Sequence, residues 1–236
     1  MRKILSGIAL VAAFAGTVNA QNNKDVLEGN GKSVTRDVAV QSFSRLKASG
    51  VYELKLSQGD KESVKIEADE NLQHLFEVKN EGSQLVIDMK KLKNTNLKSK
   101  NKMRVHITFR KLSDVELSTV GNVQSENRLS FDDLKLENSS VGNVDLDMTA
   151  NSLNVKNTSV GNVHLKGKAE RAVFVNNGVG NLEAGDFMVQ TLNIDNSGVG
   201  HAEVNAEKEC KVKDSFLGKV NNRGSAPVRK TGKVVI

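Results

Sequence analysis

Apolar and polar residues alternate in short runs through the second half of the chain, and these runs recur at a regular spacing. Each recurrence is marked by an apolar residue followed by glycine, and usually by asparagine and another apolar residue. The glycines are Gly121, Gly142, Gly161, Gly180, Gly200 and Gly218. Subtraction of successive positions gives steps of 21, 19, 19, 20 and 18 residues. A period of about 20 residues is typical of a repeat architecture.

The apolar positions on either side of each glycine predict strands. The residues six positions before the glycine are Val115, Leu136, Val155, Phe174, Ile194 and Val212, and those two positions after it are Val123, Val144, Val163, Leu182, Ala202 and Val220. Alternation with a period of two predicts β-strands. Strands that repeat in this way, with no helical segment between them, suit an all-β solenoid whose coils stack at about 4.8 Å.

A polar column accompanies the apolar ones, four residues before the glycine. Its members are Asn138, Asn157, Asn176 and Asn196. Because like residues stack on like in a solenoid, their amides can hydrogen-bond along the axis, which predicts a structural ladder; the alternative is a row that binds a ligand. The glycines are predicted to form the corners of the coils. Cys210 falls in a column otherwise filled by leucine and alanine, so we expect a buried thiol that serves packing.

Residues 38–236 are predicted to form a single domain. Residues 38–111 alternate without the glycine phrase, which indicates irregular coils or a small sheet continuous with the solenoid. Residues 112–222 correspond to six regular coils, and residues 223–236, with Pro227, to a C-terminal cap. The strands expected in the first part are 51–56, 64–68, 76–79, 85–89 and 104–109.

The N-terminus has the pattern of a signal peptide over residues 1–20. Arg2 and Lys3 precede an apolar run from Ile4 to Phe14, and small residues end at Ala20, where cleavage is expected. Residues 21–37 are predicted to be a flexible segment. No later stretch has the roughly 18 apolar residues that a membrane-spanning helix needs. The sequence therefore predicts export to the periplasm or the cell surface, with no transmembrane segment in the mature chain.

Charge adds one candidate contact surface. The chain carries 34 lysine and arginine residues against 28 acidic ones, a net charge of +6. These charges are interspersed, and with export they argue against nucleic acid as a partner. One run contains basic residues and no acid: Lys90, Lys91, Lys93, Lys98, Lys100, Lys102 and Arg104. We expect either a solvated, mobile loop or a patch that contacts anionic polysaccharide or a membrane surface.

The strongest candidate for chemistry is the column three residues after the glycine. It places Asp145, His164 and Glu183 on neighbouring coils, roughly 5 Å apart. Two carboxylates and an imidazole at that separation suit metal binding or acid–base catalysis; the alternative is an ordinary polar exterior. The other histidines show no metal-ligand spacing, and no nucleophile elbow or phosphate-binding loop is present. No cofactor and no resident metal are therefore predicted.

The chain resembles the bacterial autotransporter adhesin head GIN domain family, from about Phe43 to Ile236. The resemblance rests on the opening segment 43–54, on Ala68-Asp69-Glu70-Asn71-Leu72, on segment 82–87, on the glycine phrases and on the closing segment 224–227. Family members usually carry Gly-Ser-Gly where this chain has forms such as Ser140-Val141-Gly142. The resemblance implies a right-handed parallel β-helix similar to pectin-lyase-type solenoids, no family-wide catalytic residues, and a role in adhesion.

These observations favour an exported, non-enzymatic β-solenoid that binds cell-envelope glycans or other surface macromolecules. One alternative is a polysaccharide-active enzyme that uses the outward face of Asp145, His164 and Glu183. Another is a structural envelope protein that assembles through the ends of its coils. The sequence does not indicate an oligomeric state.

Overall fold

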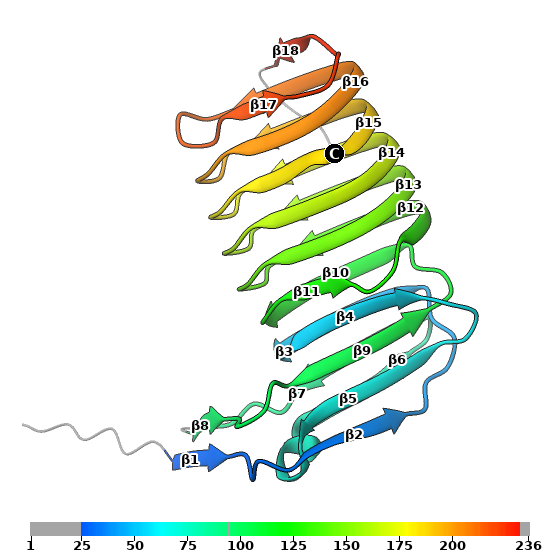
Figure 1. Ribbon diagram of the computed structural model, residues 1–236, viewed down its shortest axis with the longest axis vertical. Helices are drawn as coiled ribbons and strands as arrows, with labels where there is room; N and C mark the ends of the chain where they lie inside the picture. Colours follow the sequence, from blue (N-terminus) through cyan, green and yellow to red (C-terminus); the bar gives the residue numbers. More distant parts are fainter. Residues whose placement is uncertain (1–24, 94, 232–236) are drawn as a thin grey trace, which may run out of the picture.

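A computed structural model describes residues 25–93 and 95–231 of the chain. It is a β-solenoid of about six turns with about 20 residues per coil, which confirms the predicted all-β fold. The coils stack along the longest axis of the molecule (Figure 1). The predicted signal peptide, residues 1–20, lies outside the described residues. Within the described residues, no helix is long and apolar enough to cross a membrane.

Five long strands form the regular part of the solenoid. They are β12 (Leu129–Asn138), β13 (Val144–Asn157), β14 (Val163–Asn176), β15 (Leu182–Asn196) and β16 (Ala202–Asp214). Each pairs in parallel with the next, and the apolar columns stay in register, as in the pairing of Val144 with Val163. In β13 the buried side chains alternate as far as Ala150 and resume at Leu153. The strand therefore bends there, and each coil has two walls joined by this bend and by the glycine corner.

Glycine is required at the corners by both backbone conformation and contact. The φ angles of Gly121, Gly142, Gly161, Gly180 and Gly200 lie between 132° and 145°, a region that L side chains rarely adopt. A Cβ at Gly161 would collide with the carbonyl oxygen of Gly142 in the preceding coil. Gly218 differs from the other five because its φ is not in this region. A Cβ there would still collide with the carbonyl oxygen of Asn196.

The interior holds both apolar ladders and a polar one. Phe174 in β14 and Phe187 and Ile194 in β15 are fully buried, and Phe174 stacks on Ile194 in the next coil. The four predicted asparagines are also buried, and the first three each donate to the asparagine of the next coil: Asn138 Nδ2 to Asn157 Oδ1 at 2.8 Å, Asn157 to Asn176 at 2.7 Å, and Asn176 to Asn196 at 2.6 Å. These bonds satisfy amides that would be costly to bury unpaired.

The N-terminal half continues the solenoid. Strands β3 (Arg45–Val51) and β4 (Glu53–Gln58) form a coil that pairs in parallel with β10 (Asp114–Val120) and β11 (Val123–Ser125). On their other side, β3 pairs with β7 (Gln84–Met89) and β4 with β9 (Arg104–Phe109), again in parallel. Residues 59–113, which include β9, therefore separate in sequence two coils that are adjacent in space.

Antiparallel strands close the N-terminal end. β5 (Ser63–Asp69) pairs with β9 and with β2 (Ser33–Val38), and β6 (Phe76–Glu81) pairs with β7. The short helix η1 (Glu70–Leu75) buries Leu72 and Leu75 against this end. At the other end, β17 (Val220–Asn222) and β18 (Val228–Lys230) pair with β16.

Two segments of the N-terminal half for which flexibility was considered contain paired strands. Within the segment 21–37 predicted to be flexible, β1 (Asp25–Glu28) and most of β2 are paired strands. The partner of β1 is β8 (Thr95–Lys98), which lies inside the basic run that was expected to be either a mobile loop or a patch for anionic surfaces. β1 and β8 hydrogen-bond to each other, and β2 hydrogen-bonds to β5. Pairing between strands so far apart in the sequence cannot be predicted from the short strands themselves.

Candidate functional site on the outer sheet face

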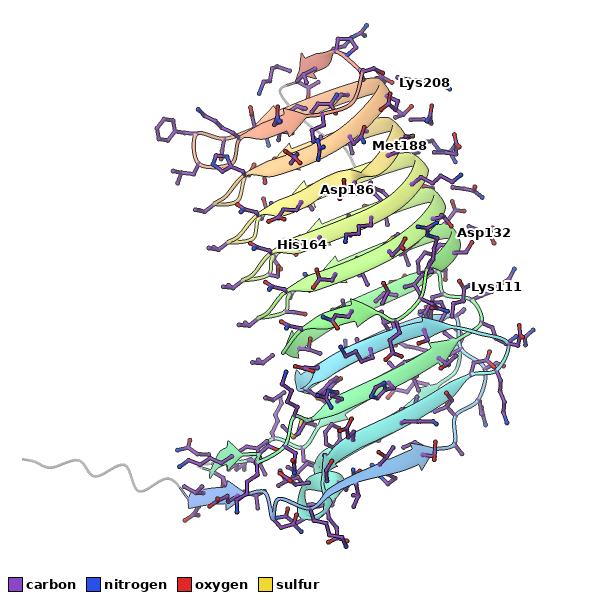
Figure 2. All side chains as sticks on the ribbon, viewed as in Figure 1. Lys111, Asp132, His164, Asp186, Met188 and Lys208 are labelled. Atoms are coloured by element: carbon purple, nitrogen blue, oxygen red, sulfur yellow. The ribbon has the colours of Figure 1, made fainter. Side chains whose placement is uncertain are left out.

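The outward column predicted from the repeat is a continuous ladder across the molecule. Asp145, His164 and Glu183 occupy paired positions on β13, β14 and β15. The register extends in both directions to give an outer ladder that contains Lys65, His106, Lys55, Gln124, Asp145, His164, Glu183, Glu203 and Asn221. It runs along one exposed wall of the solenoid, the wall that carries His164 in Figure 2.

His164 lies between the two carboxylates on either side of it. Its Nδ1 is 3.0 Å from Asp145 Oδ1, and its Nε2 is 3.2 Å from Glu183 Oε2. The three side chains are about one-third to one-half exposed. Each imidazole nitrogen faces a carboxylate of a neighbouring coil. The three residues therefore converge, as the predicted spacing of the coils requires.

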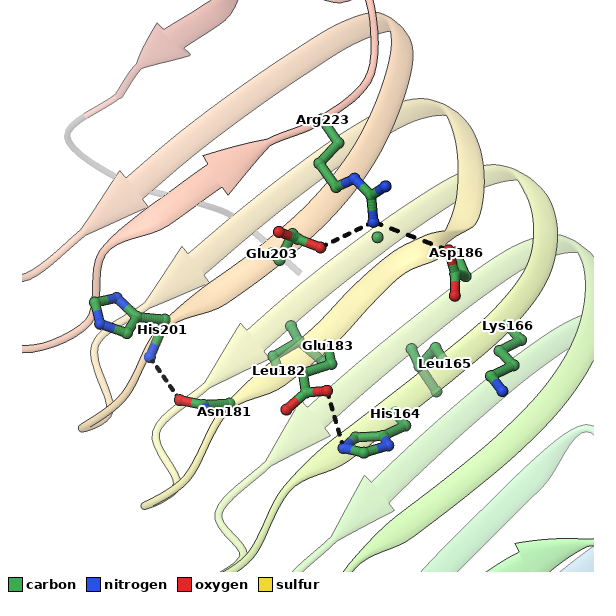
Figure 3. Close-up of a pocket in the computed structure, with 11 residues that line it drawn as sticks. His164, Leu165, Lys166, Asn181, Leu182, Glu183, Asp186, His201, Glu203 and Arg223 are labelled. Carbon is green, nitrogen blue, oxygen red and sulfur yellow. Dashed lines mark hydrogen bonds and ion pairs between the residues drawn. The ribbon is translucent and has the colours of Figure 1, made fainter.

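Beside this triad the wall is hollowed into a cavity of about 420 Å³ (Figure 3). Its lining includes His164, Lys166, Asp186, His201 and Arg223. Arg223 Nη1 is 3.2 Å from Glu203 Oε1 and 3.9 Å from Asp186 Oδ1, so the guanidinium bridges two coils. The lining is rich in groups that donate or accept hydrogen bonds, and it opens to solvent along the sheet.

The hollow depends on an irregularity in the strand pairing. The register between β14 and β15 shifts after His164 and Glu183, so that Lys166 pairs with Asp186. Gly185 occupies the extra position, and a Cβ there would collide with the carboxylate of Glu203 and crowd Arg223. A bulge of this kind redirects side chains on an otherwise regular sheet. It places Asp186 where Arg223 can reach it.

The chemistry open to this site is hydrogen bonding and charge complementarity. No group of three or more His, Cys, Asp or Glu side chains in the described residues has the geometry to hold a metal ion. Cys210 is fully buried, and burial raises the pKa of its thiol, so it cannot act as a surface nucleophile. The arrangement thus presents a polar surface, and the described part of the chain places no activated nucleophile beside it.

The seven residues of the basic run differ in whether they form ion pairs. Three of its members pair with acids: Lys100 with Glu28 at 3.4 Å, Lys102 with Glu53 at 3.0 Å, and Arg104 with Glu53 and Glu67 at 3.2 and 3.0 Å. Hydrogen bonding to Lys102 lowers the pKa of Glu53, and hydrogen bonding to Glu67 raises that of Arg104. Within the described residues, Lys90, Lys91, Lys93 and Lys98 are exposed and have no acid within 4 Å. The seven residues therefore do not form one free cationic patch.

Sequence reasoning missed several members of the outer face. His106 belongs to the same ladder as His164 and lies 3.3 Å from Glu126, and His201 lines the same cavity as His164. The histidines look scattered in the sequence because His106 precedes the repeats. Arg223 follows the last repeat and carries no periodic signal; its position is set by the hydrogen bond from its backbone N–H to the carbonyl of Val204.

The fold and parts of the sequence are shared with proteins of known structure. A crystal structure from Bacteroides fragilis, described as a "putative adhesin", is 29% identical, with a TM-score of 0.74; the match covers 87% of this chain and 100% of that one. A "putative adhesin" from Parabacteroides merdae is 21% identical, with a TM-score of 0.56 and coverage of 88% and 99%. A "putative lipid binding protein" from Parabacteroides distasonis is 18% identical, with a TM-score of 0.62 and coverage of 88% and 100%. The last two likenesses show the fold alone.

A search of the curated proteins finds none that matches this chain. A family model does match, over residues 42–226, which is most of the solenoid and its N-terminal end. The chain belongs to the family described as "Putative auto-transporter adhesin, head GIN domain".

Proposed function

We propose that the protein is an exported, non-enzymatic binding module whose outer ladder face recognises cell-envelope glycans. The observation that carries the proposal is the hollowed wall around His164 and Arg223, where polar side chains from several coils face one cavity. A glycan presents hydroxyl groups at repeating intervals, and the ladder offers carboxylates, amides and imidazoles at repeats of about 4.8 Å. Membership in an adhesin family supports the same role.

The solenoid also supplies the rigidity that such recognition needs. The stacked strands and the buried asparagine ladder hold the outward side chains in place before a ligand arrives. A preorganised surface loses little conformational entropy on binding. Export rests on the signal-peptide pattern of residues 1–20, with cleavage after Ala20 and delivery to the periplasm or the cell surface.

A glycan array probed with the mature protein, residues 21–236, tests the proposal. We expect binding to one class of glycan. The affinity should fall at least tenfold in the double variant Asp145→Asn/Glu183→Gln, because the substitutions remove both carboxylates that face His164. The matched control is Glu170→Gln/Asp60→Asn, which removes two exposed carboxylates away from the cavity. A blank array, or equal losses in the two double variants, would overturn the proposal.

The convergence of Asp145, His164 and Glu183 leaves one second function to test, the hydrolysis of a polysaccharide. Glycosidases use two carboxylates that flank the scissile bond, whereas here both carboxylates face the same imidazole. We therefore expect no release of reducing ends from any glycan that binds. Hydrolysis by the purified protein that disappears in Asp145→Asn would replace the binding proposal with an enzymatic one.

A further inference from the structure

An exposed apolar crest runs along the glycine corners, on a different part of the surface from the outer ladder. It consists of the residue before each corner glycine and its equivalents in the neighbouring coils: Val51, Val120, Val141, Val160, Val179, Val199 and Leu217. The exposed fractions of these side chains lie between 47% and 60%. Together these seven residues are called the valine crest. Its corners are the narrow loops at the left of the coils in Figure 1.

The crest is continuous. Parallel bridges connect Val120, Val141, Val160, Val179 and Val199 in sequence, and Val51 pairs with Val120. Six steps of about 4.8 Å make a line about 29 Å long. At its C-terminal end, Phe216 precedes Leu217 and is 90% exposed. Aligned apolar side chains of this kind on a monomer mark an interaction site more often than scattered ones do.

Through five successive coils the outward positions on either side of the crest hold no aspartate, glutamate, lysine or arginine. On one side are Ser118, Ser139, Thr158, Asn177 and Ser197, and on the other are Asn122, Asn143, Asn162, Asn181 and His201. The asparagine side chains also stabilise the corner, because each Oδ1 accepts a hydrogen bond from the next coil's backbone, as Asn143 Oδ1 does from Asn162 N at 3.0 Å. Charged residues such as Glu137, Lys156 and Asp145 begin one outward position further along each strand.

The shape of the crest indicates which kind of partner can bind it: a second copy of the chain, a glycan or a lipid surface. The crest lies on a corner, so it is convex, and a second copy would meet it ridge against ridge. A line about 29 Å long and one side chain wide would bury on the order of 300 Å² per copy, well below the roughly 800 Å² per partner of a stable interface. A glycan would gain few hydrogen bonds from valine. A lipid surface, by contrast, deforms around a convex apolar edge and accepts uncharged side chains at its interface.

We propose that the valine crest and Phe216 lie in the surface of a lipid bilayer, so that the solenoid rests along the membrane with its outer ladder face exposed. The valines insert to the depth of the acyl boundary, and the flanking serine and asparagine side chains remain among the headgroups. Phe216 supplies an aromatic side chain at one end, a residue type suited to shallow insertion. The acids that begin one position further out limit the depth of insertion.

Vesicle flotation with the mature protein tests this directly. We expect it to float with zwitterionic phosphatidylcholine vesicles, with no gain from anionic phosphatidylglycerol, because the crest carries no charge. The variant Val141→Ser/Val160→Ser/Val179→Ser should lower the partition coefficient about tenfold or more. The control Met188→Ser/Val228→Ser removes side chains that are 45% and 42% exposed, and Met188 lies on the opposite corner (Figure 2). It should bind vesicles like the wild type.

A single reporter variant covers the case in which the triple variant does not fold. The chain has no tryptophan, so Phe216→Trp gives emission from one site, which should shift to the blue and be quenched by brominated lipids when vesicles are added. Absence of flotation or of this shift would overturn the proposal, as would unchanged flotation of a folded triple variant. If light scattering shows a dimer for the wild type that the folded triple variant no longer forms, the crest serves self-association and the membrane proposal is wrong. The Asp145→Asn/Glu183→Gln variant should still float, which separates this proposal from glycan binding.

Discussion

Asn157 donates a hydrogen bond from its Nδ2 to Oδ1 of Asn176, at 2.7 Å, inside the solenoid and between two successive coils. Its own Oδ1 accepts from Asn138 Nδ2 at 2.8 Å and from Ser159 Oγ at 2.8 Å. One side chain therefore connects three coils. The stacking fixes the register of the strands, because a slip by one residue would bring an outward-facing side chain such as Lys156 or Thr158 against the buried amides.

Asn157→Ala should lower the free energy of unfolding by about 2–4 kcal/mol. The substitution leaves the amide N–H of Asn138 and the amide oxygen of Asn176 buried without their partner, at about 1–3 kcal/mol for each unsatisfied group. Urea denaturation followed by circular dichroism measures the change. Asn154→Ala, in the same strand but with a partly exposed side chain, is the matched control and should cost less than about 1 kcal/mol. Similar losses in both variants would contradict a specific role for the ladder.

Gly161→Ala should destabilise the protein by about 3 kcal/mol or more. Its φ of 137° is strained for alanine, and the added Cβ would collide with the backbone of Gly142 in the coil before it. Gly82 provides the control, because its φ of 59° is also positive but nothing lies within 4 Å of an added Cβ. Gly82→Ala should cost only about 1–2 kcal/mol, the conformational strain alone. Thermal unfolding of the two variants in parallel would show whether the contact or the φ angle dominates.

The repeat made the regular coils predictable, since period-two alternation around Gly142 and Gly161 determines which side chains face inward. The same period brought Asp145, His164 and Glu183 together, because stacked coils place equivalent positions one strand apart. Arg223 could not be anticipated in this way. It reaches Asp186 only because Gly185 adds a residue to β15, and a bulge leaves no mark in a spacing that already varies between 18 and 21 residues.

The N-terminal half was harder to predict for a topological reason. β3 is paired with β10, although 62 residues lie between Val51, the last residue of β3, and Asp114, the first of β10, and short strands carry no signal for such distant partners. For the same reason flexibility was expected for the segment that contains β1 and was one of two expectations for the run that contains β8. Each is only four residues long, and its order comes from pairing with the other.

Asp69 should make the N-terminal end of the protein sensitive to acid. This carboxylate is fully buried, and burial raises its pKa, but hydrogen bonds from Asn101, Lys100 and Ser99 outweigh that effect and lower the pKa below the usual value. Because the folded state favours the ionised form, its contribution to stability is present above the pKa of the unfolded chain and is lost as pH falls through the depressed folded value.

Asp69→Asn is therefore expected to destabilise the protein at pH 7 and to have a smaller effect near pH 3. The amide cannot accept all of the hydrogen bonds that reach both carboxylate oxygens, which include those from Lys100 N and Ser99 Oγ at 2.9 Å. Urea midpoints measured at the two pH values give the comparison. Hydrogen exchange at the amides of Lys100 and Asn101 locates the effect, and an equal loss of stability at both pH values would contradict the assigned charge state.

Cys210 offers a probe of global opening, because it is the only cysteine and its side chain is fully buried in β16. Burial also raises the pKa of the thiol, which reduces the thiolate available for reaction. We expect no reaction with a thiol reagent in the native protein and the incorporation of one equivalent in urea. The labelling rate at low urea should increase more in Gly161→Ala than in Gly82→Ala, since the first substitution disrupts the contact between coils as well as straining the backbone. Rapid labelling of the native wild type would show that β16 and the C-terminal strands open independently of the rest of the solenoid.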